Sequence, residues 1–169
     1  MKYLSLIVAV LLFSNSFAQS FLKKENNNFT LVKSLQQETA YKMDLSGIES
    51  IVKNAFPDTE KSVKTDPSKH EIRANGFVLN KNLFAKNLNG AVTYNFSLSL
   101  QEHSCKMTFT DFLFQYYEKN DKGQYLPTAR FKSLSELEQE LSPELFQELL
   151  KETERRLDDI ISQLNGQIK

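Results

Sequence analysis

One stretch of the chain alternates between apolar and polar side chains without interruption. The apolar positions are Val92, Tyr94, Phe96, Leu98 and Leu100, and the polar positions between them are Thr93, Asn95, Ser97 and Ser99. Side chains on a β-strand point alternately to its two faces, so this spacing predicts a strand with one buried face and one solvated face. Strands of this kind are typical of antiparallel sheets that are covered on one side.

The segment that follows changes phase partway along. Its first apolar set is Cys105, Met107 and Phe109, and its second set, Phe112, Phe114 and Tyr116, lies in the opposite phase. An inserted residue at Thr110-Asp111, a β-bulge, would let both sets face the same core in turn. Burial of both faces of a long strand would give the same pattern, so the sequence leaves these two interpretations open.

Two segments have the spacing of amphipathic helices. From Thr39 to Phe56 apolar residues recur every three or four positions, and Pro57 should end that helix. A second stripe runs from Leu145 to Leu164 after the start signal Ser142-Pro143-Glu144, and Gly166 should end it. Ser133 and Glu136 have the spacing of a capping box, which predicts a further helix start.

Weaker signals complete the element order. Residues 29–33 could form an edge strand, and residues 61–65 and 70–78 read as a hairpin around the turn 66–69. Residues 80–90 and 120–127 are expected to be loops. The order strand, helix, four strands, helix contains no repeated βαβ unit, so it predicts an α+β domain with an antiparallel sheet and helices packed on one face.

The first eighteen residues resemble an export signal. A short basic start is followed by an apolar run of about ten residues, which is long enough for a secretory signal and too short to cross a bilayer. Ser16 and Ala18 are the small residues expected before a cleavage site. We therefore expect residues 1–18 to be a cleavable signal peptide and the mature protein to be periplasmic or extracellular, without a transmembrane anchor.

The rest of the chain has room for one ordinary domain, since the whole chain has 169 residues. Residues 19–28 are polar and are expected to be a flexible lead-in. Residues 29–166 should form a single α+β domain, and residues 167–169 a tail.

Composition argues against several classes of function. The 21 basic and 21 acidic residues give a net charge of zero, which provides no field for gathering nucleic acid. The single cysteine, Cys105, excludes a disulfide framework within the chain and a multi-cysteine metal centre, and its phase predicts a buried thiol. His103 and Cys105 lie two residues apart, but with His70 as the other histidine they make an incomplete ligand set. No catalytic, metal or cofactor residues are predicted.

Several of these segments together resemble a known family. They are the helix ending at 48–56, the turn and strand 68–76, and the strand pair 92–100 and 105–112, which includes the triplet Thr110-Asp111-Phe112. The pattern is similar to exported bacterial domains of unknown function with a TATA-binding-protein-like (TBP-like) fold. This resemblance implies a five-stranded antiparallel sheet with two main helices on one face, and it implies no enzymatic activity.

An uncovered sheet face would be the natural place for a binding surface. Thr93, Asn95 and Ser97 should point away from the helices, and Tyr117 ends the aromatic run that begins at Phe109. Core packing accounts for much of that run, and a partner surface on the open side of the sheet is the alternative. We expect a non-enzymatic module that binds another envelope protein, either through these four residues on the open sheet face or through a strand edge. A carrier of a small apolar or amphipathic ligand is the second hypothesis.

Overall fold

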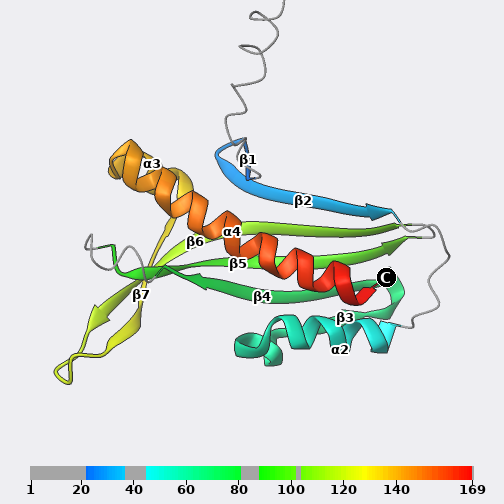
Figure 1. The fold of residues 1–169 in the computed structure, drawn as a ribbon. Coiled ribbons are helices and arrows are strands. Elements are labelled where there is room, and N and C mark those ends of the chain that lie inside the picture. Colours follow the sequence, from blue (N-terminus) through cyan, green and yellow to red (C-terminus); the bar gives the residue numbers. More distant parts are fainter. Residues whose placement is uncertain (1–21, 37–44, 81–87, 102–103, 169) are drawn as a thin grey trace, which may run out of the picture.

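The computed structural model describes residues 22–36, 45–80, 88–101 and 104–168. Within them an antiparallel sheet is covered on one face by helices (Figure 1). The predicted signal peptide, most of the loop 80–90 and His103 lie outside the described residues.

The sheet contains seven described strands. Six of them are neighbours in the order β1-β2-β6-β5-β4-β3, and the seventh, β7, also pairs with β6. Their bounds are β1 Lys23–Glu25, β2 Asn28–Gln36, β3 Lys64–Asp66, β4 Glu71–Leu79, β5 Gly90–Gln101, β6 Ser104–Lys119 and β7 Tyr125–Ser133. Every pairing is antiparallel. The alternating stretch predicted from 92 to 100 lies inside β5, which confirms that strand.

Three described α-helices accompany the sheet: α2 Leu45–Ala55, α3 Leu134–Glu140 and α4 Pro143–Ile168. Two short 3-10 helices, η1 Pro57–Ser62 and η2 Pro67–Lys69, flank β3. Helix α2 ends before Pro57 as predicted, and Ser133 and Glu136 form the predicted capping box at the start of α3. Figure 1 shows α4 crossing the sheet diagonally, with α2 beside it.

The core lies between the helices and one face of the sheet. Aromatic side chains fill it: the Phe96 ring lies 5.0 Å from the rings of both Phe56 and Phe109, measured between centroids. Phe96, Phe109 and Phe114 have almost no exposed surface. Cys105 is buried among these residues, as its phase predicted. Burying each large apolar side chain contributes about 1.5–3 kcal/mol before the entropy of ordering is subtracted.

The phase change in β6 is a β-bulge. The register with β5 shifts between Thr93 and Asn95, so that Asp111 and Phe112 of β6 together face Tyr94. Asp111 has a φ of 54°, in the left-handed region that a short polar side chain tolerates better than most. Of the two interpretations that the sequence left open, the bulge is therefore confirmed.

Several expectations need correction. The lead-in is ordered from Leu22 onward: Leu22 is buried, and Lys23–Glu25 pair with β2 as strand β1. Pro127 lies in strand β7 and not in a loop, because an edge strand can accept a residue without an N–H donor. With β1 and β7 the sheet has more than the five strands expected, and α3 adds a third helix.

Helix α4 also continues through Gly166 to Ile168. The side chain of Ile168 is buried, and this burial offsets the weak helix propensity of glycine at the last turn. The predicted tail at 167–169 therefore belongs to the helix as far as residue 168.

Gly90 provides a test of the close packing at the start of β5. A Cβ atom there would lie 2.3 Å from the backbone oxygen of Gln115, which cannot move without distorting β6. We expect Gly90→Ala to lower the free energy of unfolding by about 1–3 kcal/mol. Gly166→Ala is the control, since nothing lies within 4 Å of its Cβ, and it should leave stability unchanged or raise it by up to about 1 kcal/mol. Equal effects of the two substitutions in urea unfolding would contradict this account.

Candidate functional site

The face of the sheet away from the helices carries the predicted surface residues. Thr93, Asn95 and Ser97 alternate with the buried residues of β5 and are partly or fully exposed. Tyr117 points to the same face from the end of β6, where it lines a hollow together with Thr93 and Asn95. We call this uncovered surface the open face. The structure thus brings three of the four residues into one hollow, and Ser97 lies in the adjoining one.

The adjoining hollow is polar and has a volume of about 640 Å³. Its lining includes Lys61, Lys64, Arg73, Asn95, Ser97 and Asp111. Arg73 is held by Glu71 at 2.7 Å, and this hydrogen bond raises the pKa of the guanidinium. Lys61 and Lys64 are exposed, and within the described part of the chain neither has a carboxylate at ion-pair distance. This end of the open face therefore carries two exposed ammonium groups, and the Asp111 carboxylate lies in the same hollow.

Asp111 lies between the two hollows and lines both of them. Asn95 donates a hydrogen bond from Nδ2 to the Asp111 carboxylate at 2.7 Å, and Thr110 donates another from its hydroxyl at 3.2 Å. The bulge positions this carboxylate on the open face while turning Phe112 into the core. Asp111 and Asn95 therefore form a fixed polar centre on this face.

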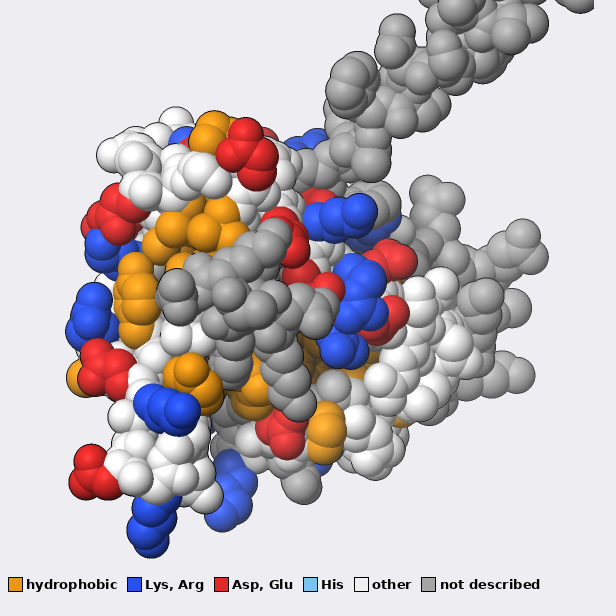
Figure 2. Space-filling view, turned by 60° about the vertical axis from the view of Figure 1, so that its left-hand side comes forward, with side chains coloured by type: hydrophobic (Ala, Val, Ile, Leu, Met, Phe, Trp, Pro, Cys, Tyr) orange, Lys and Arg blue, Asp and Glu red, His pale blue; other side chains and the backbone are white. Residues whose placement is uncertain are grey.

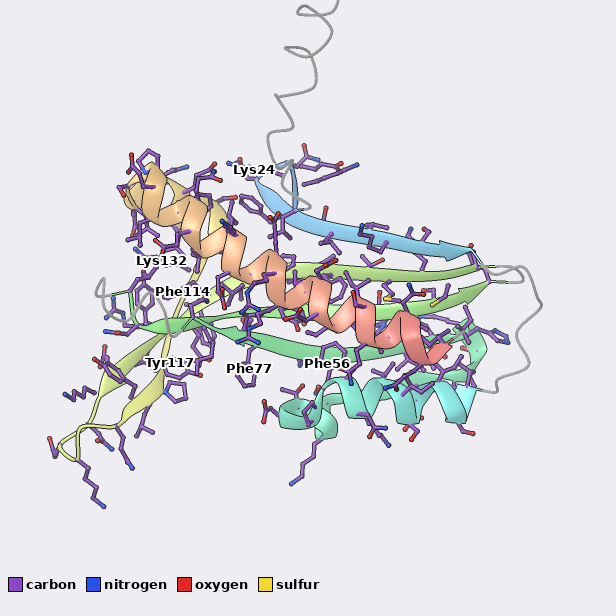
Figure 3. All side chains as sticks on the ribbon, viewed as in Figure 1. Lys24, Phe56, Phe77, Phe114, Tyr117 and Lys132 are labelled. Carbon is purple, nitrogen blue, oxygen red and sulfur yellow. The ribbon has the colours of Figure 1, made fainter. Side chains whose placement is uncertain are left out.

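The second hollow is more apolar and has a volume of about 440 Å³. Phe77 of β4, Leu113 and Tyr117 of β6, and Phe131 of β7 surround Thr93. Phe77 and Leu113 are each 37% exposed and Phe131 is 48% exposed, so the hollow presents apolar surface to solvent. Burial raises the pKa of the Tyr117 phenol, which keeps it neutral and able to donate a hydrogen bond. Figure 3 labels Phe77 and Tyr117, which reach this hollow from different strands.

The four surface residues expected from the sequence do not include Phe77, Leu113 or Phe131, although Leu113 lies within the aromatic run and Phe131 follows it. A signal was present for two of them: Phe77 and Leu113 occupy the polar phase of strands whose other phase is buried. A large apolar residue in the solvated phase of a half-buried strand is a recognisable anomaly. Phe131 carried no such signal, because β7 was not predicted as a strand.

The remaining aromatic residues of the run from Phe109 belong mostly to the core. Phe109, Phe112 and Phe114 are buried, whereas Tyr116 is half-buried beneath Arg130, whose guanidinium carbon lies 4.7 Å from the ring centroid. Figure 2 shows hydrophobic side chains interspersed with charged ones on one end of the molecule. The core interpretation of the aromatic run is therefore confirmed for Phe109, Phe112 and Phe114, whereas Tyr117 lies on the open face.

Several ionisable groups elsewhere have structural partners. Glu136 caps α3, and the hydrogen bonds from Ser133 lower the pKa of its carboxyl. Glu138 and Glu140 pair with Lys24 and Lys132. Among the described residues no group of three or more His, Cys, Asp or Glu side chains could hold a metal ion. None of the described helices has both the length and the apolar character needed to cross a membrane.

Comparisons with known proteins define the class of this fold. A crystal structure of a TBP-like protein from Parabacteroides distasonis matches with a TM-score of 0.58 and 14% identity, over 85% of this chain and 97% of that one. A crystal structure of a DUF4468 family protein from Bacteroides ovatus matches with a TM-score of 0.56 and 10% identity, over 89% of this chain and 91% of that one. The protein is an α+β domain with a TBP-like fold.

A family model matches the middle part of the chain. Residues 46–115 match the family described as a domain of unknown function (DUF4468) with TBP-like fold. The family resemblance predicted from the sequence is therefore confirmed over this segment, which runs from α2 to the second half of β6. No curated protein matches the chain.

The strained backbone of Asp111 gives a test of the bulge. Replacing Asp111 by Gly or by Ala removes the same carboxylate, but only Ala keeps a Cβ in the left-handed region. We expect Asp111→Gly to be more stable than Asp111→Ala by about 1–2 kcal/mol in urea unfolding. Asn95→Ala serves as the control for loss of the hydrogen bond alone. Equal stability of the Gly and Ala variants would show that this residue is not held at positive φ.

Proposed function

We propose that the protein is an exported, non-enzymatic module that binds another envelope protein through its open face. The observation that carries the proposal is the cluster of exposed apolar side chains around the apolar hollow, on a face that the described helices leave uncovered. Contiguous apolar surface rimmed by polar groups is typical of interaction sites. Export is proposed from the character of residues 1–18.

The two hollows define the chemistry of the partner. The apolar hollow suits an aromatic or aliphatic side chain, which would be buried between Phe77, Leu113 and Phe131. The exposed Lys61 and Lys64 suit an acidic group at the other end of the same surface. We therefore expect a protein partner that presents an apolar anchor and a neighbouring carboxylate. Binding of this kind should weaken as salt concentration rises, because both lysines are exposed to solvent.

Lysine substitutions at the centre of the open face test the proposal. In Thr93→Lys/Ser97→Lys, two long charged side chains would obstruct both hollows without entering the core. We expect recovery of the partner from the host's envelope extract, measured by quantitative mass spectrometry, to fall by about tenfold or more, because the apolar anchor would lose its site.

Gln147→Lys is the matched control. Gln147 is exposed on α4, so this substitution adds a lysine side chain away from the open face. The control should recover the partner as well as the natural protein does. Equal recovery by the double variant, the control and the natural protein would contradict the proposed surface.

A carrier of a small apolar or amphipathic ligand is the second candidate, and one further hollow favours it. This hollow, of about 600 Å³, lies between the end of β4 and α4, where Val78, Leu79 and Ile160 adjoin Arg155 and Glu152. Native mass spectrometry of the protein purified from its own host should show an added mass if it carries a ligand. Ile160→Glu should abolish that added mass, and a ligand-free mass for the natural protein would argue against this candidate.

A further inference from the structure

Among the described residues, strand β2 has a free edge along two thirds of its length, over residues 31–36. On one side, residues 31–36 of β2 pair with β6. On the other side, β1 pairs with residues 28–30 and stops there. Figure 1 shows β2 continuing past β1 at the margin of the sheet, with no described element alongside. Free strand edges present unpaired backbone donors and acceptors, and natural proteins usually cover or disrupt them.

The turn before β2 determines which backbone groups face this edge. Asn26 and Asn27 have φ values of 49° and 63°, as in a two-residue type I′ hairpin turn. The closing residues, Glu25 and Asn28, then exchange both hydrogen bonds, and the backbone groups of successive residues alternate between the two sides of the strand. The N–H and C=O groups of Val32, Ser34 and Gln36 therefore face the free edge, and those of residues 31, 33 and 35 face β6.

The rest of the sheet agrees with this alternation. The registers between β2, β6 and β5 are regular in this half of the sheet. They require the backbone N–H and C=O groups of Leu100 to point toward β4. The Leu100 N–H does donate to the carbonyl of His70, at 2.9 Å. At the opposite edge the backbone N–H and C=O groups of Asn75 point outward. Ser62 Oγ accepts a hydrogen bond from the Asn75 N–H at 2.9 Å and donates one to the Asn75 carbonyl at 3.3 Å. One margin of the sheet is thus partly capped by a side chain, whereas no described residue caps the β2 margin over residues 31–36.

We propose that the free edge of β2 pairs antiparallel with the same edge of a second copy of this chain. The register is centred on Ser34, so that Ser34 lies opposite the second copy's Ser34 and Val32 opposite its Gln36. This register uses all three outward-facing residues of each chain. It forms a twofold-symmetric interface, in which the same residues of both copies pair with each other.

The neighbouring registers are less favourable. Centring on Lys33 would place two lysines directly opposite each other and would bring position 36 against the segment already paired with β1. Centring on residue 35 would leave Val32 without a partner. The register on Ser34 avoids both problems, since Lys33 then lies opposite position 35.

Two observations favour a second copy as the occupant. The open segment is bounded by β1 at one end and by the end of β2 at the other, so it accepts a strand of about the length of the segment itself. The Val32 side chain is 51% exposed, and pairing would shield part of that apolar surface. An interface of this size falls below that of stable dimers, so we expect the dimer to form at high concentration.

Ser34→Pro tests the pairing. Proline would remove an outward N–H and leave the hydrogen bonds to β6 intact, because those come from residues 33 and 35. Sedimentation equilibrium over a wide concentration range should show a monomer–dimer equilibrium for the natural protein and for the control Ser34→Ala. The association constant of Ser34→Pro should be lower by about tenfold or more. Circular dichroism checks that the variants are folded.

A matched charge pair tests the register and the identity of the occupant. Ser34→Lys and Ser34→Glu would each place two like charges at the twofold axis, so each should be monomeric alone. Mixed in equal amounts, they should form a dimer containing one copy of each. Only a register centred on this exposed residue, between two copies of the chain, predicts that result.

Three results would overturn the proposal: a natural protein that stays monomeric at the highest concentration, an undiminished dimer in Ser34→Pro, or a mixture of the Lys and Glu variants that gives no mixed dimer. The proposal does not rest on the open-face function. Thr93→Lys/Ser97→Lys should still dimerise, so failure of one proposal is distinguishable from failure of the other.

Discussion

The β-bulge at Asp111 and Phe112 is the constraint on which both faces of the sheet depend. Strand β6 has sixteen residues, pairs with β5 along most of its length, and contributes to the core at both ends. Because side chains on a strand alternate with a period of two, a one-residue slip exchanges the two faces. The bulge supplies that slip, so Phe109 and Phe114 both reach the helices although they lie in opposite phases. It also turns Leu113 and Tyr117 to the open face and thereby supplies one side of the apolar hollow.

The bulge also explains why polar and apolar features meet on the open face. Asp111 is the bulge residue with positive φ and lies between the two hollows. A hydrogen bond from Asn95 fixes its carboxylate there. On one side of it the surface is basic, and on the other it is aromatic. A binding site that combines an apolar anchor with a charged rim needs both features within a short distance of each other. The bulge places Asp111 of β6 between the lysines of η1 and β3 and the apolar residues around Thr93.

The elements that could be predicted from the sequence were those whose pattern is periodic and local. The alternation in β5, the stripe in α2 with its proline stop, and the capping box of α3 each depend on residues close together in the chain. Strands β1 and β7 could not be predicted in this way, because one is three residues long and the other contains Pro127 and faces solvent over much of its length. Their formation depends on β2 and β6, which offer edges to pair with. For the same reason the position of Thr93, Asn95 and Ser97 on the open face follows from local alternation, whereas the position of Phe131 on that face depends on β7.

The free edge of β2 and the open face are related by geometry. In an antiparallel pair of identical strands within one continuous sheet, the twofold axis is perpendicular to the sheet, so each copy keeps its own face on the same side. In the proposed dimer both open faces therefore point the same way, and the helices of both copies lie on the other side. The strand twist of about 20–25° per neighbouring pair would curve the combined surface gradually. A partner with two matching segments, or an array of partners at a surface, would then bind both hollows at once, and the second contact would form at the high effective concentration that a linked site provides. Weak pairing along β2 and modest affinity at each hollow would reinforce one another, because occupation of both open faces by one partner also holds the two copies together.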